Sequence, residues 1–202
     1  MSNFKRNGYG QIEPNQLSAQ KTGQIYASLM LDKNVSVLQN GEFMYYDYVS
    51  NTVSADDSTG VAEPMLVYNE VKIYEDRLTY KDFAMIRVGD NYVTHGLYTD
   101  AYGDGAENEG AEVSHVEYGY RMDGFAPRLF KTNIGDIYTT NMVKTGVEYK
   151  VGDLLAPKKN DESKTMVLEV AGDAANEKML WAVVKVYTMP DGQDGLKLQR
   201  VK

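Results

Sequence analysis

Short runs in which apolar and polar residues alternate, each ended by a cluster of turn-forming residues, restrict the fold of this chain more than any other feature. In residues 24–31, QIYASLML, the side chains of Ile25, Ala27, Leu29 and Leu31 recur at every second position, which is the period of a β-strand. Similar runs lie at 35–48, 65–74, 82–98 and 113–122, and at intervals through 132–202. No stretch keeps the helical 3.6-residue period for more than about two turns. The pattern predicts a mostly-β protein with a sandwich or barrel-like body and little helix.

Several local signals refine this prediction. Asn40-Gly41 lies between two β-prone runs and predicts a tight hairpin, because both residues tolerate the positive φ angles of a type I′ turn. Residues 15–21, NQLSAQK, predict a short helix with Asn15 as its cap. Residues 50–63 are polar and predict a long loop. Trp181 lies in KMLWAVVKVYTM, which is apolar on both faces of a strand, so we expect it in the core rather than on a sugar-binding surface.

The N-terminal segment differs from the rest of the chain in charge and composition. Residues 1–34 hold four basic and two acidic side chains, a net charge of +2, whereas the remainder holds 17 and 27, a net charge of −10. Few residues before Gln24 are strongly apolar, and glycines interrupt the segment. We therefore predict an extended N-terminal arm, residues 1–23, followed by a β-rich domain at 24–125 and a C-terminal β-domain at 126–202. A single continuous β unit is the alternative to the last boundary.

Composition excludes several classes of protein. The chain contains no cysteine, so disulfides, thiolate catalysis and cysteine metal sites are absent. No window approaches eighteen consecutive apolar residues, so we expect no membrane span. The net charge of −8 makes nucleic acid an unlikely partner.

No motif in the sequence predicts catalysis, a cofactor or a metal centre. The acidic loop 100–112 offers carboxylates for calcium, but its spacing does not follow an EF-hand, and a solvated loop is the simpler interpretation. His95 and His115 are the only histidines, and a zinc site needs three or four ligands. We find no phosphate-binding loop and no nucleophile elbow. The expected protein is not an enzyme, with no catalytic, cofactor-binding or metal-binding residues.

Two segments together resemble a known class of proteins. These are the Gly- and Gln-containing N-terminal segment NGYGQIEPNQLSAQKTGQIYASL and the C-terminal runs YKVGDLLAPKKNDESKTMVLEVAG and WAVVKVYTM, ending in LKLQRVK. They look like small virion proteins of tailed bacteriophages, of the head-associated decoration or auxiliary capsid type. The resemblance implies a non-enzymatic protein that binds the assembled capsid, with the major capsid protein or other virion proteins as partners. It also implies self-association, and a location in the virion after assembly in the host cytoplasm.

The excess of tyrosine suggests which side chains make such contacts. Tyrosine occurs 16 times, and it is enriched at interfaces because it combines apolar area with a hydroxyl group. The sequence predicts partner contacts from the arm and from the tyrosine cluster at 45–48. The candidate residues are Lys5, Arg6, Tyr9, Ile12, Leu17, Tyr45 and Tyr46. A carbohydrate- or cell-surface-binding module of a fibre or adhesin is the alternative function.

Overall fold

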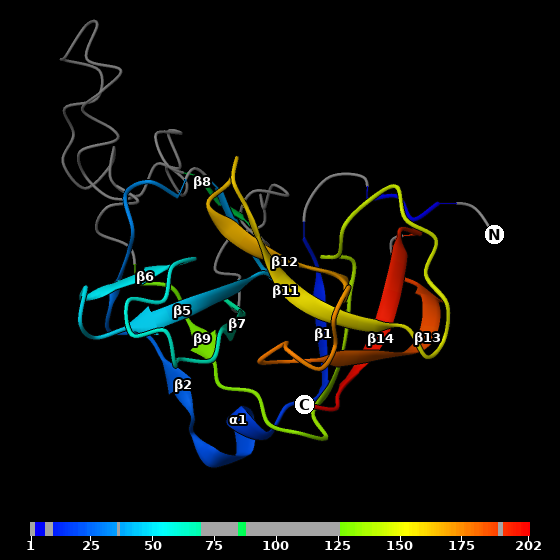
Figure 1. Cartoon of the computed structure of the whole chain (residues 1–202), viewed down its shortest axis with the longest axis horizontal. Coiled ribbons are helices and arrows are strands. Elements are labelled where there is room, and N and C mark those ends of the chain that lie inside the picture. Colours follow the sequence, from blue (N-terminus) through cyan, green and yellow to red (C-terminus); the bar gives the residue numbers. More distant parts are fainter. Residues whose placement is uncertain (1–2, 7–9, 36, 70–84, 88–125, 190–191) are drawn as a thin grey trace, which may run out of the picture.

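The computed structural model of the chain describes residues 3–6, 10–35, 37–69, 85–87, 126–189 and 192–202 (Figure 1). The acidic loop 100–112, His95, His115 and Tyr9 lie outside these residues. The elements are β1 (Ile12–Gln16), α1 (Ser18–Thr22), β2 (Ile25–Tyr26), β3 (Met30–Leu31), β4 (Val37–Gln39), β5 (Phe43–Asp47), β6 (Thr52–Ser54), β7 (Met65–Val67), β8 (Met85–Arg87), β9 (Leu129–Phe130), β10 (Ile137–Thr140), β11 (Leu154–Asn160), β12 (Thr165–Val170), β13 (Trp181–Thr188) and β14 (Asp194–Arg200).

Most of the described strands form one curled sheet, so the prediction of a mostly-β, barrel-like body is confirmed. The strand order is β1-β10-β14-β13-β11-β12-β5-β7-β9-β2, and all of these neighbours are antiparallel. β6 and β3 extend the sheet from the far end of β5, and β3 and β6 pair in parallel. β4 pairs with β8 in a separate small sheet.

The connection between the two outermost strands requires the curl. Ten strands at about 4.8 Å spacing would span about 43 Å if the sheet were flat. Residues 17–24 are all that joins β1 to β2, and because five of them are helical they reach only about 20 to 25 Å. The sheet therefore bends into a half-barrel, with α1 crossing the open side (Figure 1).

A buried carboxylate fixes α1 to the sheet. Asp136 lies just before β10 and is 4% exposed. Its Oδ1 accepts a hydrogen bond from the backbone N–H of Ser18 (3.0 Å), and its Oδ2 accepts one from the Ser18 hydroxyl (2.9 Å). The helix thus begins at Ser18, three residues after the predicted cap. Asn15 instead belongs to β1 and accepts a hydrogen bond from Thr139.

The core fills the inside of the half-barrel. Trp181 is fully buried, as the apolar pattern of its strand predicts, and packs edge-on against Tyr138 at a ring-centroid distance of 4.8 Å. Phe43 of β5 lies on its other side at 6.0 Å. Because β5, β10 and β13 each contribute a ring, the core joins strands that are far apart in sequence.

The predicted hairpin at Asn40-Gly41 is wrong. β4 and β5 do not pair with each other: β4 pairs with β8, and β5 with β12, β7 and β6. The turn is closed by a hydrogen bond from the N–H of Glu42 to the carbonyl of Gln39, and only Gly41 has a positive φ, 93°. That places the positive φ at the third turn position, as in a type II turn, which does not match the twist of a two-residue hairpin.

The alternating run 24–31 is also shorter in strand than expected. It forms β2 and β3, with a break between them. At this break the Tyr46 hydroxyl accepts hydrogen bonds from the backbone N–H groups of Ser28 (2.9 Å) and Leu29 (3.0 Å). These groups therefore bond to a side chain instead of a neighbouring strand. The predicted loop 50–63 holds one short strand, β6.

The described part of residues 1–23 does not extend away from the body, which corrects the prediction of an N-terminal arm. β1 pairs with β10, and Leu17 and Ala19 are buried in the core. The strands of the two predicted domains also share the sheet, because β9 pairs with β7 and β12 pairs with β5.

Candidate functional site

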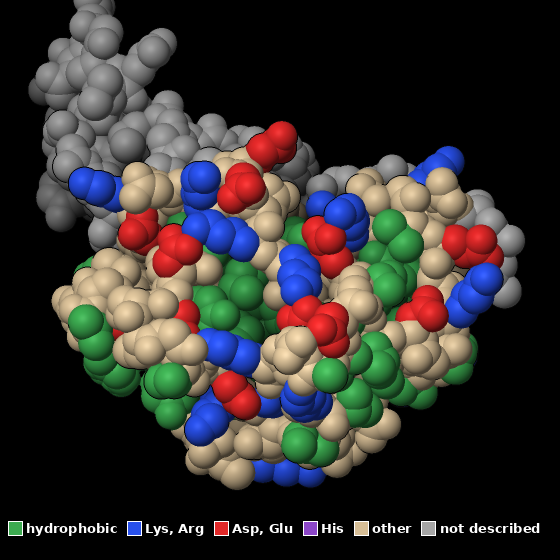
Figure 2. Space-filling view, in the orientation of Figure 1, with side chains coloured by type: hydrophobic (Ala, Val, Ile, Leu, Met, Phe, Trp, Pro, Cys, Tyr) green, Lys and Arg blue, Asp and Glu red, His purple; other side chains and the backbone are tan. Residues whose placement is uncertain are grey.

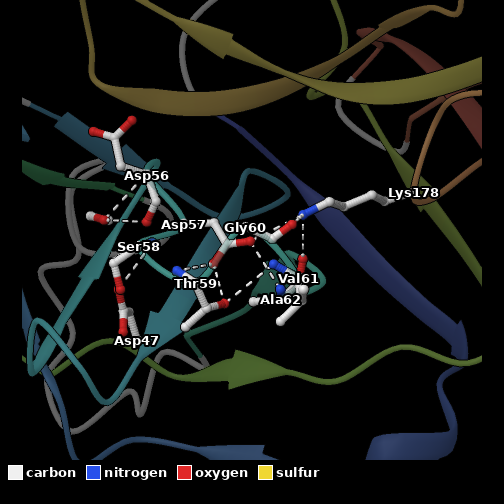
Figure 3. Close-up of polar contacts among 10 residues, drawn as sticks. Asp47, Asp56, Asp57, Ser58, Thr59, Gly60, Val61, Ala62 and Lys178 are labelled. Carbon is white, nitrogen blue, oxygen red and sulfur yellow. Dashed lines mark hydrogen bonds and ion pairs between the residues drawn. The ribbon is translucent and has the colours of Figure 1, made fainter.

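The best-defined surface site is built from the two connections that follow β5 and β6. Asp47, the last residue of β5, organises both of them. Its Oδ1 accepts hydrogen bonds from the backbone N–H groups of Val49 (2.7 Å) and Ser50 (3.3 Å), and its Oδ2 accepts one from Ser58 (3.3 Å). These bonds to Asp47 lower the pKa of its carboxyl group, led by the contribution of Ser58. One carboxylate therefore holds the turn 48–51 and the loop 56–62 together (Figure 3).

Asp57 fixes the loop 56–62 from inside. Its Oδ1 accepts hydrogen bonds from the backbone N–H (3.0 Å) and the hydroxyl (2.7 Å) of Thr59, and its Oδ2 accepts one from the backbone N–H of Ala62 (2.9 Å). The side chain is 8% exposed. Burial raises its pKa, but the hydrogen bonds from Thr59 and Lys178 outweigh this effect and bring the pKa to about 2. Asp57 is therefore ionised at neutral pH and serves as a structural acceptor.

Lys178, which is distant from the loop in sequence, also fixes it by hydrogen bonds. It lies before β13, and its Nζ donates to Asp57 Oδ2 (3.0 Å) and to the carbonyls of Gly60 (2.6 Å) and Ala62 (3.3 Å) (Figure 3). The ammonium group also lies 6.0 Å from the ring centroid of Tyr45. Three oxygens of the loop thus accept hydrogen bonds from one ammonium group, and these bonds fix the loop backbone.

Two further ion pairs lie on the strand next to this site. Lys159 of β11 pairs with Asp56 (2.5 Å), and Lys158 pairs with Glu177 (2.5 Å). Figure 2 shows one face of the molecule, on which acidic and basic side chains surround a hollow with hydrophobic side chains at its floor. Exposed pairs of this kind contribute little to stability, about 0 to 1 kcal/mol each. The two ion pairs fix the orientation of the four charged side chains that form them.

The connections fixed by Asp47 and Asp57 present apolar side chains to solvent. Tyr48 is 69% exposed, Val49 75% and Val61 82%. We call these three residues the loop surface. Apolar side chains that a fold holds rigidly in solvent are typical of contact sites, because little conformational entropy remains to be lost on binding. Sequence reasoning missed Val49, and it missed Val61, which lies in the segment 50–63 that reads only as a polar loop.

The two predicted contact residues in β5 have different roles. Tyr45 is half-buried beside Lys178, and burial raises the pKa of its phenol. Because its ring is not fully buried, Tyr45 remains a candidate. Tyr46 is 7% exposed, and its hydroxyl is used by the break between β2 and β3. We therefore assign Tyr46 a structural role.

The predicted contact residues of the N-terminal segment lie apart from the loop surface. Lys5 is exposed, and its backbone N–H donates to Asp194 (2.9 Å). Arg6 is half-buried, and its Nη1 donates to the carbonyl of Val143 (3.3 Å). Ile12 packs partly buried against the core, whereas Leu17, at 1% exposure, is not accessible to a partner.

A buried carboxyl group that no sequence pattern indicates lies behind Arg6. Glu42 is 1% exposed. The backbone N–H of Gln39 donates to its Oε2 (2.8 Å), and the hydroxyl of Thr165 donates to its Oε1 (2.8 Å). Burial raises the pKa of Glu42 to about 7, against the lowering effects of these hydrogen bonds and of Arg6. Because this carboxyl group is buried, we treat it as a determinant of stability.

In the part of the chain that the structure describes, neither metal ligands nor membrane-spanning helices identify a further site, and comparison with known proteins identifies none. No group of three or more His, Cys, Asp or Glu residues is placed to hold a metal ion within the described ranges. In the same ranges, no helix has the length and apolar character needed to cross a membrane. The chain matches no protein-family model, no curated protein and no solved structure.

Proposed function

We propose that this chain is a non-enzymatic structural protein of a virion that binds the assembled capsid, of the decoration or auxiliary head type. The observation that supports a binding role best is the loop surface: three strongly exposed apolar side chains on connections fixed by Asp47 and Asp57. A binding surface fixed before the encounter loses little entropy when it meets a partner. The capsid as partner rests on the resemblance of the sequence to phage head proteins.

The proposal places the contact on the loop surface and not on residues 10–24. Those residues form β1 and α1, in which Leu17 and Ala19 are buried and not available for a partner, and Ile12 is partly buried against the core. Lys5 is exposed at the other end of the segment and stays a candidate for an ionic contact.

The test is co-sedimentation of the purified protein with capsids from the virus that carries its gene. We expect the wild type to sediment with particles, and Val61→Asp and Tyr48→Ser to stay in the supernatant. Val170→Asp is the matched control, because Val170 is an exposed valine (47%) on β12, away from these loops. If the loop variants bind as the wild type does, the loop surface is not the contact. If the wild type does not bind, the capsid is not the partner.

One observation favours a second candidate, a carbohydrate-binding module. The Tyr45 ring lies beside Lys178 and near the carboxylates of Asp56 and Asp57, and an aromatic ring flanked by polar groups suits a sugar ring. This function predicts hits on a glycan array that disappear in Tyr45→Ala. An array without hits would remove this candidate.

A further inference from the structure

One strand of the sheet has an edge that pairs with no other strand among the described residues. β13 pairs with β11 only through Trp181 and Ala182, and the contact between Gly152, Asp153 and Val183 extends this by one residue. Beyond it, residues 185–188 pair with β14 on one side alone, and Val184 lies at an irregularity in the register between Val183 and Lys185. Among the described residues no other main-chain hydrogen bond reaches them. We call residues 184–188 the β13 edge; β13 and β14 lie at the right of Figure 1.

The outermost strands of the same sheet carry features that prevent pairing. β1 contains Pro14 and an irregularity in register between Glu13 and Gln16. After β2, the backbone N–H groups of Ser28 and Leu29 are bonded to the Tyr46 hydroxyl. Natural sheets commonly block their edges with prolines, bulges and side chains in this way. On the β13 edge, such features are confined to the first two residues, the register irregularity at Val184 and the charged side chain of Lys185, and residues 186–188 carry none.

The β13 edge is apolar on one face and carries lysine and tyrosine on the other. Val186 pairs with Leu196 of β14, so both side chains point to the inner face. Leu196 is fully buried, whereas Val186 is 41% exposed because the sheet ends there. Lys185 and Tyr187 share the outer face, and the Lys185 ammonium lies 5.7 Å from the Tyr187 ring centroid.

We propose that two copies of this chain associate through their β13 edges, antiparallel and centred on Val186, so that the two sheets become continuous. The inner face would then carry an unbroken apolar row: Leu196 and Val186 of one copy, then Val186 and Leu196 of the second. On the outer face, Lys185 of each copy would lie opposite Tyr187 of the other, a favourable cation–aromatic pair. The proposal does not depend on the function proposed above.

Charge and length select this register over its neighbours. Centring on Lys185 would place two lysines opposite each other, which is destabilising. Centring on Tyr187 would leave Val184 outside the pairing and shorten it. Centring on Val186 pairs Lys185, Val186 and Tyr187 of both copies and brings Thr188 opposite Val184, at the irregularity in register.

Cysteine cross-linking tests the interface and its register together, since the chain contains no cysteine. In Val186→Cys the two thiols of a dimer face each other at a separation that a disulfide spans. We expect it to form a disulfide-linked dimer roughly tenfold faster than Val184→Cys, because pairing raises the effective thiol concentration only at the centre. Val184 is the matched control, at 43% exposure on the same edge.

Sedimentation velocity provides a second measurement on the unmodified chain. The wild type should show concentration-dependent dimers, and Val186→Lys should remain monomeric at the same concentrations. A wild type that is monomeric throughout, or a Val184→Cys variant that cross-links as fast as Val186→Cys, would overturn the proposal. Binding of an acidic peptide by a monomeric wild type would also overturn it, because it would assign the edge to another partner.

Discussion

The burial of Glu42 predicts that Glu42→Gln stabilises the protein at alkaline pH. In the unfolded chain this carboxyl group releases its proton near its ordinary pKa of 4.5, whereas in the fold the pKa is about 7. Between these values the folded state holds more protons than the unfolded state, so the free energy of unfolding falls as the pH rises from 4.5 to about 7 and is constant above it. The loss amounts to about 3 kcal/mol, at 1.36 kcal/mol per pKa unit.

Glutamine reproduces the neutral form of this side chain. Its oxygen accepts from the backbone N–H of Gln39, and its amide group donates to the Thr165 hydroxyl, which can in turn donate to Ser163 at 2.8 Å. The variant should therefore match the wild type near pH 4.5. It should be more stable by about 2 to 3 kcal/mol at pH 8, where the wild type carries a buried charge.

The measurement is urea denaturation of both proteins at several pH values between 4.5 and 8.5, followed by subtraction of the two curves. Because subtraction removes the titration of every other group, the difference isolates Glu42. Glu162→Gln makes the same change on an exposed turn residue, and its free energy of unfolding should stay within about 0.5 kcal/mol of the wild type. Parallel curves for Glu42→Gln and wild type across this range would refute the reasoning, since the buried carboxyl would then titrate as it does in the unfolded chain.

Three other substitutions test how the loops and the helix are fixed. Asp136→Ala removes the acceptor that ties α1 to β10 and should lower the free energy of unfolding by about 2 to 3 kcal/mol, with less effect for Asp136→Asn; equal, negligible effects would contradict this. Lys178→Met should cost about 1 kcal/mol and open the loop 56–62 to limited proteolysis, and unchanged cleavage would show that Lys178 does not hold the loop. Gly41→Ala should cost more than about 2 kcal/mol, because φ is 93° and a Cβ would lie 2.7 Å from side-chain atoms around the end of β10. Gly135→Ala, with φ of 96° but no atom within 4 Å, should cost only about 1 kcal/mol in the same denaturation assay, and equal costs at the two glycines would refute the steric argument.

The candidate site could be predicted only in part. Tyrosine enrichment led to Tyr45, which is half-buried beside Lys178, but equally to Tyr46, which is buried. Nothing in the spacing of residues 48–62 distinguishes Val61, exposed at the loop tip, from a valine such as Val53 that is buried in the sheet. The difference arises from the carboxylates of Asp47 and Asp57, which turn the backbone by accepting several N–H groups each.

The sequence by itself determined the class of fold and one element of the core. Period-two runs can bury one face only in a sheet, so the strands of 129–200 and the position of Trp181 follow from local pattern. Which strands pair was decided by the tertiary structure. Asn40-Gly41 carries a strong local hairpin signal, yet β4 and β5 separate: β5 pairs with β12 on one edge and with β7 on the other, and β4 pairs with β8. The polar N-terminal segment likewise forms β1 and α1, since β1 pairs with β10. Local composition could not predict this, because β10 lies more than a hundred residues away in the sequence. Pairing depends on contacts made across the whole chain, and these exist only once the sheet has curled.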